Sequence, residues 1–172
     1  GQSSLEAVKT INLNESVSVI GDNAIFKDIS FNVSADNVNI DNILVNITNS
    51  LSNAFNFNNA NSGTLKNSVI YFNSADSDIN PIFANNSKIS LSNNTIIVYS
   101  DNIALVLNKT NCSLSDNIFN SSSLNHEVIL NDNNSILFFY ENAINSLADP
   151  TVVTVIFSNS SNDVFLLIPL LL

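Results

Sequence analysis

Residues 85–100 read NNSKISLSNNTIIVYS, and residues 34–48 read SADNVNIDNILVNIT. In both stretches, short runs of apolar and β-branched residues alternate with polar residues, and asparagine interrupts the runs. Alternation with a period of two is typical of β-strands. Asparagine favours turns, because it tolerates the left-handed backbone conformation that a tight corner requires. We therefore predict short strands joined at asparagine corners.

The same arrangement recurs along the chain at intervals of 23 to 26 residues. Each repeat has an apolar residue, an asparagine two or three positions later, and a second apolar residue two positions after the asparagine. The first apolar positions are Ile40, Leu65, Leu91, Leu114 and Phe139. The asparagines are Asn42, Asn67, Asn94, Asn117 and Asn142, and the second apolar positions are Leu44, Val69, Ile96, Phe119 and Ile144. Repeats of this length are the signature of solenoids.

Each repeat contains a further strand later in its sequence. These strands are expected at Phe55–Phe57, Ile82–Phe83, Ile103–Leu107, Val128–Leu130 and Val152–Phe157, and an earlier unit covers Val17–Val33. A chain that coils in this way pairs equivalent strands in parallel and stacks the apolar positions into columns. The five asparagines are expected to stack in one structural column, joined by side-chain hydrogen bonds. The predicted fold is an all-β parallel solenoid of about six coils.

The two ends of the chain have different patterns from the repeats. Ser3-Ser4-Leu5-Glu6 has the spacing of a helix capping box, so a short helix over Ser3–Lys9 is expected to cap the open core. Residues Val164–Leu172 read VFLLIPLLL, which is much shorter than the roughly 20 residues of a membrane-spanning helix. We predict a cap at residues 1–12, the β-helix at 13–163, and an apolar terminal strand or a further coil at 164–172, with no membrane span.

Composition narrows the classes of partner. The 172 residues include 34 asparagines, 15 acidic residues and five lysines but no arginine, and the formal net charge is -10. This charge disfavours binding to nucleic acid or to anionic membranes. Hydrophobic residues make up 45% of the chain, which indicates a buried core rather than a disordered asparagine-rich segment. The only cysteine, Cys112, excludes an internal disulfide and is expected to pack inside.

The repeats resemble the right-handed parallel β-helix. Stretches such as Ser34–Thr48 and Asn85–Ser100 are similar in particular to the asparagine-rich, adhesin-like surface proteins of methanogenic archaea and of some AT-rich bacteria. The resemblance covers about residues 17 to 160. It implies an extracellular, cell-surface protein that acts as a rigid rod and presents loops to a cell-surface protein or a glycan.

The β-helix class also contains polysaccharide lyases, esterases and glycosidases. The lyase and esterase relatives resemble one another in using an arginine beside acidic residues, and this chain has none. Glycosidases need paired carboxylates in one cleft, for which Asp36 with Asp41 and Asp76 with Asp78 are the close pairs. We expect that the protein is not an enzyme and binds no cofactor, although Asp76-Ser77-Asp78 could hold Ca²⁺ through oxygen ligands. A carbohydrate-active enzyme of this class remains an alternative.

Three further expectations concern the surface. Tyr71 and Tyr99 follow the asparagine corners and could stack on sugar rings if they face outward; otherwise they pack in the core. A second alternative function is a self-assembling filament or surface-layer subunit, in which copies join through the solenoid ends. Possible glycosylation sites are Asn14, Asn32, Asn46, Asn85, Asn93, Asn108, Asn111, Asn120, Asn133 and Asn159.

Overall fold

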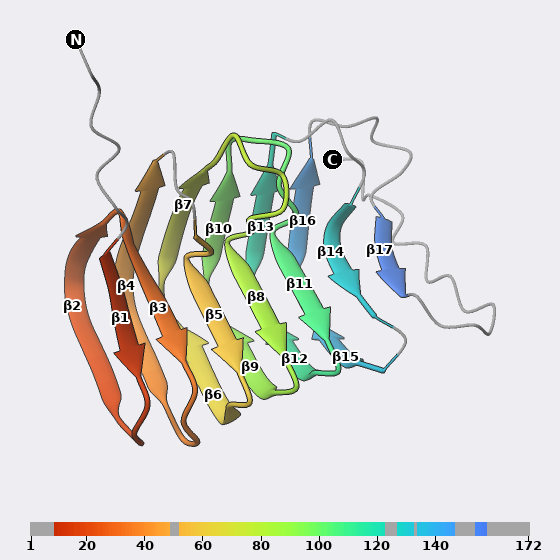
Figure 1. Ribbon diagram of the computed structural model, residues 1–172. Helices are drawn as coiled ribbons and strands as arrows, with labels where there is room; N and C mark the ends of the chain where they lie inside the picture. The colour runs from red at the N-terminus through yellow and green to blue at the C-terminus, as the bar shows by residue number, and fades with distance from the viewer. Residues whose placement is uncertain (1–8, 49–51, 123–126, 133, 147–153, 158–172) are drawn as a thin grey trace, which may run out of the picture.

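The structure, a computed structural model, describes residues 9–48, 52–122, 127–132, 134–146 and 154–157. These residues form an all-β parallel solenoid of about five turns rather than the six expected (Figure 1). In Figure 1 the chain advances from left to right, with β3, β5, β8 and β11 running downward in front and β4, β7 and β10 running upward behind them. This course makes the coil right-handed, as the resemblance to the parallel β-helix implies.

One wall of the solenoid is a sheet of seven strands in the order β1-β3-β5-β8-β11-β14-β17. Every neighbouring pair in it is parallel and comes from successive turns. The expected third strand of each repeat lies in this sheet, so that prediction is confirmed. The bounds are β1 Lys9–Leu13, β3 Ile29–Val33, β5 Phe55–Asn58, β8 Ile82–Asn85, β11 Leu105–Asn108, β14 Glu127–Asn131 and β17 Thr154–Phe157.

The other wall is a sheet of ten strands that bends at the asparagine corner. In the early turns a single long strand passes through the corner, whereas in later turns the corner divides two short strands. The long strands are β2 Ser18–Lys27 and β4 Asn39–Thr48. The strands before the corner are β6 Asn61–Lys66, β9 Lys88–Ser92, β12 Asn111–Ser115 and β15 Ile136–Tyr140. The strands after it are β7 Val69–Asn73, β10 Thr95–Val98, β13 Ile118–Ser121 and β16 Ala143–Ser146.

The strand register matches the predicted repeat. Ile40 pairs with Leu65, Leu65 with Leu91, Leu91 with Leu114, and Leu114 with Phe139, each one turn from the next. Ile40, Leu65, Leu91 and Leu114 are fully buried. The first apolar column is therefore confirmed at every position.

The core continues through the seven-stranded sheet as a stack of aromatic rings. Phe31 and Phe55 are fully buried, and their ring centroids lie 5.2 Å apart with 9° between the ring planes. Cys112 is also fully buried, at the position of Ile89 one turn earlier, as expected for a small apolar side chain. The alternation of inward apolar and outward polar residues thus follows the strand period.

The corners depend on asparagine rather than glycine. Thirteen non-glycine residues have a positive φ, and ten of these are asparagine or aspartate; no described glycine has a positive φ. The thirteen are Asp22, Asn23, Asp28, Asn37, Asn42, Asn59, Ser62, Asn67, Asn86, Asn93, Lys109, Asp116 and Glu141. Short side chains that hydrogen-bond to nearby backbone reduce the cost of this conformation. Seven of the 34 asparagines therefore have the left-handed backbone conformation.

The single asparagine column predicted from the sequence is wrong, because the five residues occupy two adjacent columns. Leu65 pairs with Leu91, so Asn67 aligns with Asn93 and not with Asn94. Asn42 and Asn67 have the positive φ of the corner, where Asn67 is exposed and Asn42 is half-buried. The residues one position further, Asn94, Asn117 and Asn142, project inward instead. The second apolar positions shift in the same way, since Ile96 pairs with Ile70 rather than with Val69.

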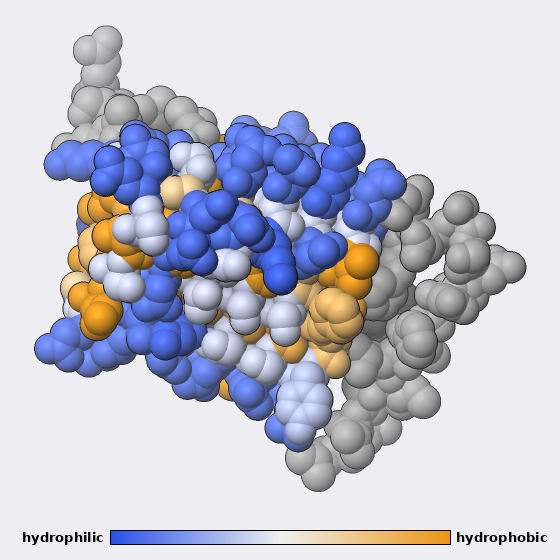
Figure 2. Space-filling model, turned by 90° about the horizontal axis from the view of Figure 1, so that it is seen from below, coloured by the Kyte–Doolittle hydropathy of each residue, from blue (hydrophilic) through white to orange (hydrophobic). Residues whose placement is uncertain are grey.

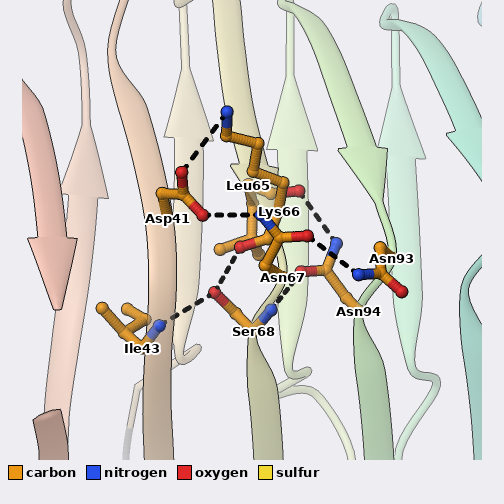
Figure 3. A network of polar contacts seen from close by, with 8 residues as sticks. All are labelled: Asp41, Ile43, Leu65, Lys66, Asn67, Ser68, Asn93 and Asn94. Carbon is orange, nitrogen blue, oxygen red and sulfur yellow. Dashed lines mark hydrogen bonds and ion pairs between the residues drawn. The ribbon is translucent and has the colours of Figure 1, made fainter. Parts of the chain in front are cut away.

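Figure 3 shows both columns at the corner. In the outer one, Asn67 Nδ2 donates to Asp41 Oδ1 at 2.8 Å, and Asn93 Nδ2 donates to Asn67 Oδ1 at 2.8 Å. In the inner one, the Ser68 backbone nitrogen donates to Asn94 Oδ1 at 3.0 Å, and Asn94 Nδ2 donates to Leu65 O at 2.8 Å. The inner column therefore satisfies buried backbone groups that the corner leaves without strand partners.

The predictions for the two ends of the chain lie largely outside the described residues. Residues 1–8 lie outside the described part, so most of the expected helix Ser3–Lys9 is not covered. The predicted cap at residues 1–12 overlaps Lys9–Leu13, which forms strand β1 instead and pairs with β3. Its apolar residues alternate with polar ones, so it forms the first strand of the seven-stranded sheet. The described residues contain no helix. Residues 164–172 also lie outside the described part.

Candidate functional site

Tyr71 and Tyr99 lie on the outer face of the strands that follow the corner. Tyr71 is in β7 between the buried residues Ile70 and Phe72, and Tyr99 directly follows β10. Tyr71 is half-buried and Tyr99 is 57% exposed. Their ring centroids are 6.4 Å apart, with 7° between the ring planes. Parallel rings of this kind support one another, so Tyr71 holds the orientation of Tyr99.

A hollow of about 270 Å³ lies on the other side of Tyr99. The strand order here is β7-β10-β13-β16, so Tyr71 comes from the strand before Tyr99, whereas the hollow extends over the strands after it. Its lining residues are Ile97, Val98, Tyr99, Asn120, Ser121, Ser122 and Asn145. The Tyr99 ring therefore forms a wall between its aromatic neighbour and an open, accessible space.

The hollow exists because side-chain size falls from one turn to the next. Val98 pairs with Ser121, and the backbone nitrogen of Ser122 bonds to Val98 O at 2.9 Å, which aligns Ser122 with Tyr99. Two small hydroxyl residues thus replace a valine and a tyrosine at equivalent positions. On the outer face, the change from Tyr99 to Ser122 leaves the half-buried Ile97 beside the open side of Tyr99.

The accessible lining of the same hollow is mostly apolar, and its few polar groups come from asparagine and serine side chains. Asn145 Nδ2 donates to Asn120 Oδ1 at 2.8 Å, which fixes both side chains and leaves Asn120 Nδ2 and Asn145 Oδ1 for other partners. Ser122 Oγ donates to Val98 O at 3.0 Å and can still accept a hydrogen bond. No charged residue lines the hollow among the residues described. One aromatic wall and a few oriented neutral polar groups can bind a sugar ring.

Asp76 and Asp78 lie in the loop between β7 and β8, where their local contacts are structural. Asp76 Oδ1 accepts a hydrogen bond from the Asp78 backbone nitrogen at 3.0 Å. Asn102 Nδ2 donates to the Asp76 backbone oxygen at 2.6 Å and to the Ile79 backbone oxygen at 2.6 Å. The Asp76 carboxylate thus closes its own turn. Within the described ranges, no three residues of the types His, Cys, Asp and Glu gather to hold a metal ion.

The two carboxylates of the other close pair, Asp36 and Asp41, each have a structural partner of their own. Asp36 Oδ1 accepts a hydrogen bond from the Asn61 backbone nitrogen at 2.9 Å. Asp41 forms an ion pair with Lys66 at 3.3 Å. The hydrogen bond from Asn67, together with Lys66, holds the pKa of Asp41 below its ordinary value. A general acid of a glycosidase needs the opposite shift.

Most of the sequon asparagines that the structure describes already form hydrogen-bonded ladders. Asn108 Nδ2 donates to Asn85 Oδ1, and Asn85 Nδ2 donates to Asn58 Oδ1, both at 2.9 Å. Asn32, Asn93 and Asn120 have equivalent side-chain contacts, whereas Asn46 is half-buried and Asn14 and Asn111 are exposed. Asn133 and Asn159 lie outside the described residues.

A flat face of small hydroxyl residues covers the strands before the corner. Thr64, Ser90 and Ser113 occupy one outward row, and Ser92 and Ser115 occupy the next. Figure 2 shows this pale surface between apolar areas at its two ends. The exposed apolar residues that belong to β2 and β15 are Ile20, Ile25, Ile136 and Phe138.

Comparison of the chain with protein-family models, curated proteins and solved structures finds no match. The likeness to adhesin-like surface proteins therefore rests on the sequence pattern and the solenoid fold alone. None of the described segments forms a helix able to span a bilayer. The sequence marks the two tyrosines as candidate binding residues, but it marks Asn120 only as a possible glycosylation site and does not mark Ser122 or Asn145, because these residues come together only through the register of three turns.

Proposed function

We propose that this chain is a non-catalytic binding module of an extracellular surface protein, and that it binds neutral glycans at the Tyr99 hollow. The observation that carries this proposal is the position of Tyr99. One side of its ring lies parallel to Tyr71 at a centroid distance of 6.4 Å, and the other side adjoins the hollow. Sugar rings have apolar faces that pack on aromatic rings, while their hydroxyl groups need oriented hydrogen-bond partners.

The neutral character of the ligand follows from the lining. Asn120, Asn145 and Ser122 offer amide and hydroxyl groups, and the described lining contains neither lysine nor carboxylate. An acidic sugar would bring an unpaired negative charge to a protein whose formal net charge is -10. We therefore assign neutral hexoses or N-acetylated sugars as the ligand class.

The non-catalytic and cell-surface parts of the proposal have separate support. One carboxylate of each close pair, Asp36 and Asp76, accepts a backbone hydrogen bond, and Asp41 forms an ion pair with Lys66. The parallel strands and the ladders make a rigid frame, which suits a protein that presents a surface to its surroundings. The resemblance of the sequence to adhesin-like repeats supports a position outside the cell.

Titration with neutral oligosaccharides, monitored by NMR or calorimetry, tests the glycan site. We expect Tyr99→Ala to weaken binding by about tenfold or more, since stacking and shape are lost together. Tyr140→Ala is the matched control, because Tyr140 is 63% exposed on β15, before the corner. Ser122→Trp should abolish binding by filling the hollow. Equal effects of Tyr99→Ala and Tyr140→Ala, or binding that survives Ser122→Trp, would contradict the proposal.

Self-assembly through the solenoid ends is a second candidate, favoured by the incomplete burial of the first and last described strands before the corner. Val19 and Phe26 in β2, and Leu137 and Phe139 in β15, pack against the core but are only partly buried. Equivalent residues in the middle turns, such as Ile40 and Leu114, are fully buried. Sedimentation over a range of concentrations tests this candidate, and a constant monomeric mass would exclude it.

A further inference from the structure

A second hollow, of about 280 Å³, lies at the start of β3 and β5, next to the residues that precede β8. Its lining is mostly polar and shares no residue with the Tyr99 hollow. The residues on which the argument depends are Thr10 from β1, Asn32 from β3, Asn53 and Asn56 at β5, and Asp78 before β8.

An amide ladder ends at this hollow. Asn32 Nδ2 donates to Asn12 Oδ1 at 3.1 Å, and Asn56 Nδ2 donates to Asn32 Oδ1 at 3.4 Å. In each step the later residue donates to the earlier one, so Asn56 Oδ1 would accept from the next turn. The residue paired with Asn56 in that turn is Phe83, which has no donor. Asn56 Oδ1 is thus an acceptor that the ladder does not use.

Other polar groups at the hollow are also available. Asn53 Oδ1 accepts from the Asn80 backbone nitrogen at 2.8 Å, which orients the side chain and leaves Asn53 Nδ2 as a donor. The Asp78 backbone is held at both ends, by Asp76 Oδ1 and by Asn80 Nδ2. Its carboxylate is exposed and pairs with no described residue, and no lysine lines the hollow within the part of the chain that the structure describes.

We propose that this hollow binds an amino sugar or a similar hydroxylated amine. Its ammonium group binds between the Asp78 carboxylate and Asn56 Oδ1, and its hydroxyl groups bond to Asn53 Nδ2 and the Thr10 hydroxyl. A carboxylate without a cationic neighbour favours a cationic ligand, and hydrogen bonds between charged groups are the stronger ones. This site is independent of the neutral-glycan site, since it uses different residues and a different charge.

Titration of the whole chain with three monosaccharides tests the proposal, with the backbone amide shifts of Asn53, Asn56 and Ile79 as the readout. Glucosamine carries the amine, glucose is the neutral comparator, and glucuronate is the anionic comparator. We expect glucosamine to bind about tenfold more tightly than glucose, with no binding of glucuronate. Equal shifts with glucose and glucosamine, or no shifts with glucosamine, would overturn the proposal.

Two variants test whether Asp78 and Asn56 bind the ammonium group. Asp78→Asn should remove the preference for glucosamine over glucose, whereas Asp116→Asn, an equal change of charge at a corner of the ten-stranded sheet, should keep it. Asn56→Leu should weaken glucosamine binding and extend the apolar column of Phe83. A preference that survives Asp78→Asn, or that is lost in Asp116→Asn, would show that the site is not the one proposed. Neutral-glycan binding at Tyr99 is unaffected by either result.

Discussion

Asn94 and Asn117 lie 23 residues apart in the chain, and Asn117 Oδ1 accepts two hydrogen bonds from Asn94, one from its backbone nitrogen and one from its Nδ2, both at 3.0 Å. Asn117 makes the same pair of contacts with Asn142, at 2.9 Å. The inner ladder donates toward the C-terminus, whereas the outer ladders at Asn67 and Asn85 donate toward the N-terminus. The two kinds of ladder therefore have opposite polarity in one molecule.

The inner ladder should contribute more to stability than the outer ones. Asn117→Ala removes an acceptor for Asn94 and a donor to Leu91 O, in a position that is fully buried. Leaving these buried groups unsatisfied should lower the free energy of unfolding by about 3 kcal/mol. Asn58→Ala, which removes only an exposed acceptor for Asn85, should cost less than about 1 kcal/mol. Urea denaturation measures both, and similar losses would contradict the difference between the ladders.

Gly21 in β2 should tolerate no side chain. A methyl group at this position would lie 2.3 Å from Ile43 Cγ2 and 2.8 Å from the Asn42 backbone oxygen. We expect Gly21→Ala to lower the free energy of unfolding by about 2 kcal/mol, because the neighbouring strand must move. Adding Ile43→Ala removes the closest contact, so the double variant should lose less than the sum of the two single losses. Additive losses in thermal unfolding would show that this contact is not the cause.

Cys112 should make stability fall at alkaline pH. Burial raises the pKa of the thiol far above its ordinary value of 9.0, so the unfolded chain releases this proton at a pH where the folded chain keeps it. Above pH 9 the contribution of Cys112 should therefore decline by about 1.4 kcal/mol per pH unit. Cys112→Val conserves volume and removes the titration. The difference between the two stability curves should grow from pH 9 upward, and parallel curves would refute the prediction.

Asp41 should make the free energy of unfolding fall at acidic pH. The Asn67 hydrogen bond and Lys66 lower the pKa of this carboxyl below its ordinary value of 3.8. A group with a lowered pKa in the folded state stabilises it above the ordinary value, and this contribution is lost as the pH falls through the folded value. Stability should thus decline less on acidification in Asp41→Asn than in the original protein. An equally steep decline in Asp41→Asn would contradict the prediction.

The fold could be predicted because the apolar columns are nearly complete. Four residues of the first apolar column, Ile40, Leu65, Leu91 and Leu114, are buried and aliphatic. Their spacing in the sequence therefore gives the number of residues per turn and the residues that pair between neighbouring turns. The asparagine column could not be assigned in the same way. Asn93 and Asn94 are adjacent, and only the backbone conformation decides which of them turns the chain and which points inward.

The candidate site was predictable only in part. The aromatic residues Tyr71 and Tyr99 stand out in the sequence, but their direction depends on the strand register, since a shift of one residue would bury them. The hollow depends on the replacement of Tyr99 by Ser122 one turn later, and on Asn145 a further turn away. Residues 23 and 46 positions from Tyr99 thus complete a site that no local pattern in the sequence marks.

The inner ladder also bears on the chemical ageing of the chain. Deamidation of asparagine requires the backbone nitrogen of the following residue to attack the side-chain carbonyl. At Asn67 and Asn93 that nitrogen is held by a hydrogen bond, from Ser68 to Asn94 Oδ1 and from Asn94 to Asn117 Oδ1. At these two corners, each turn therefore shields the amide of the turn before it, and Asn67 and Asn93 should convert to aspartate slowly.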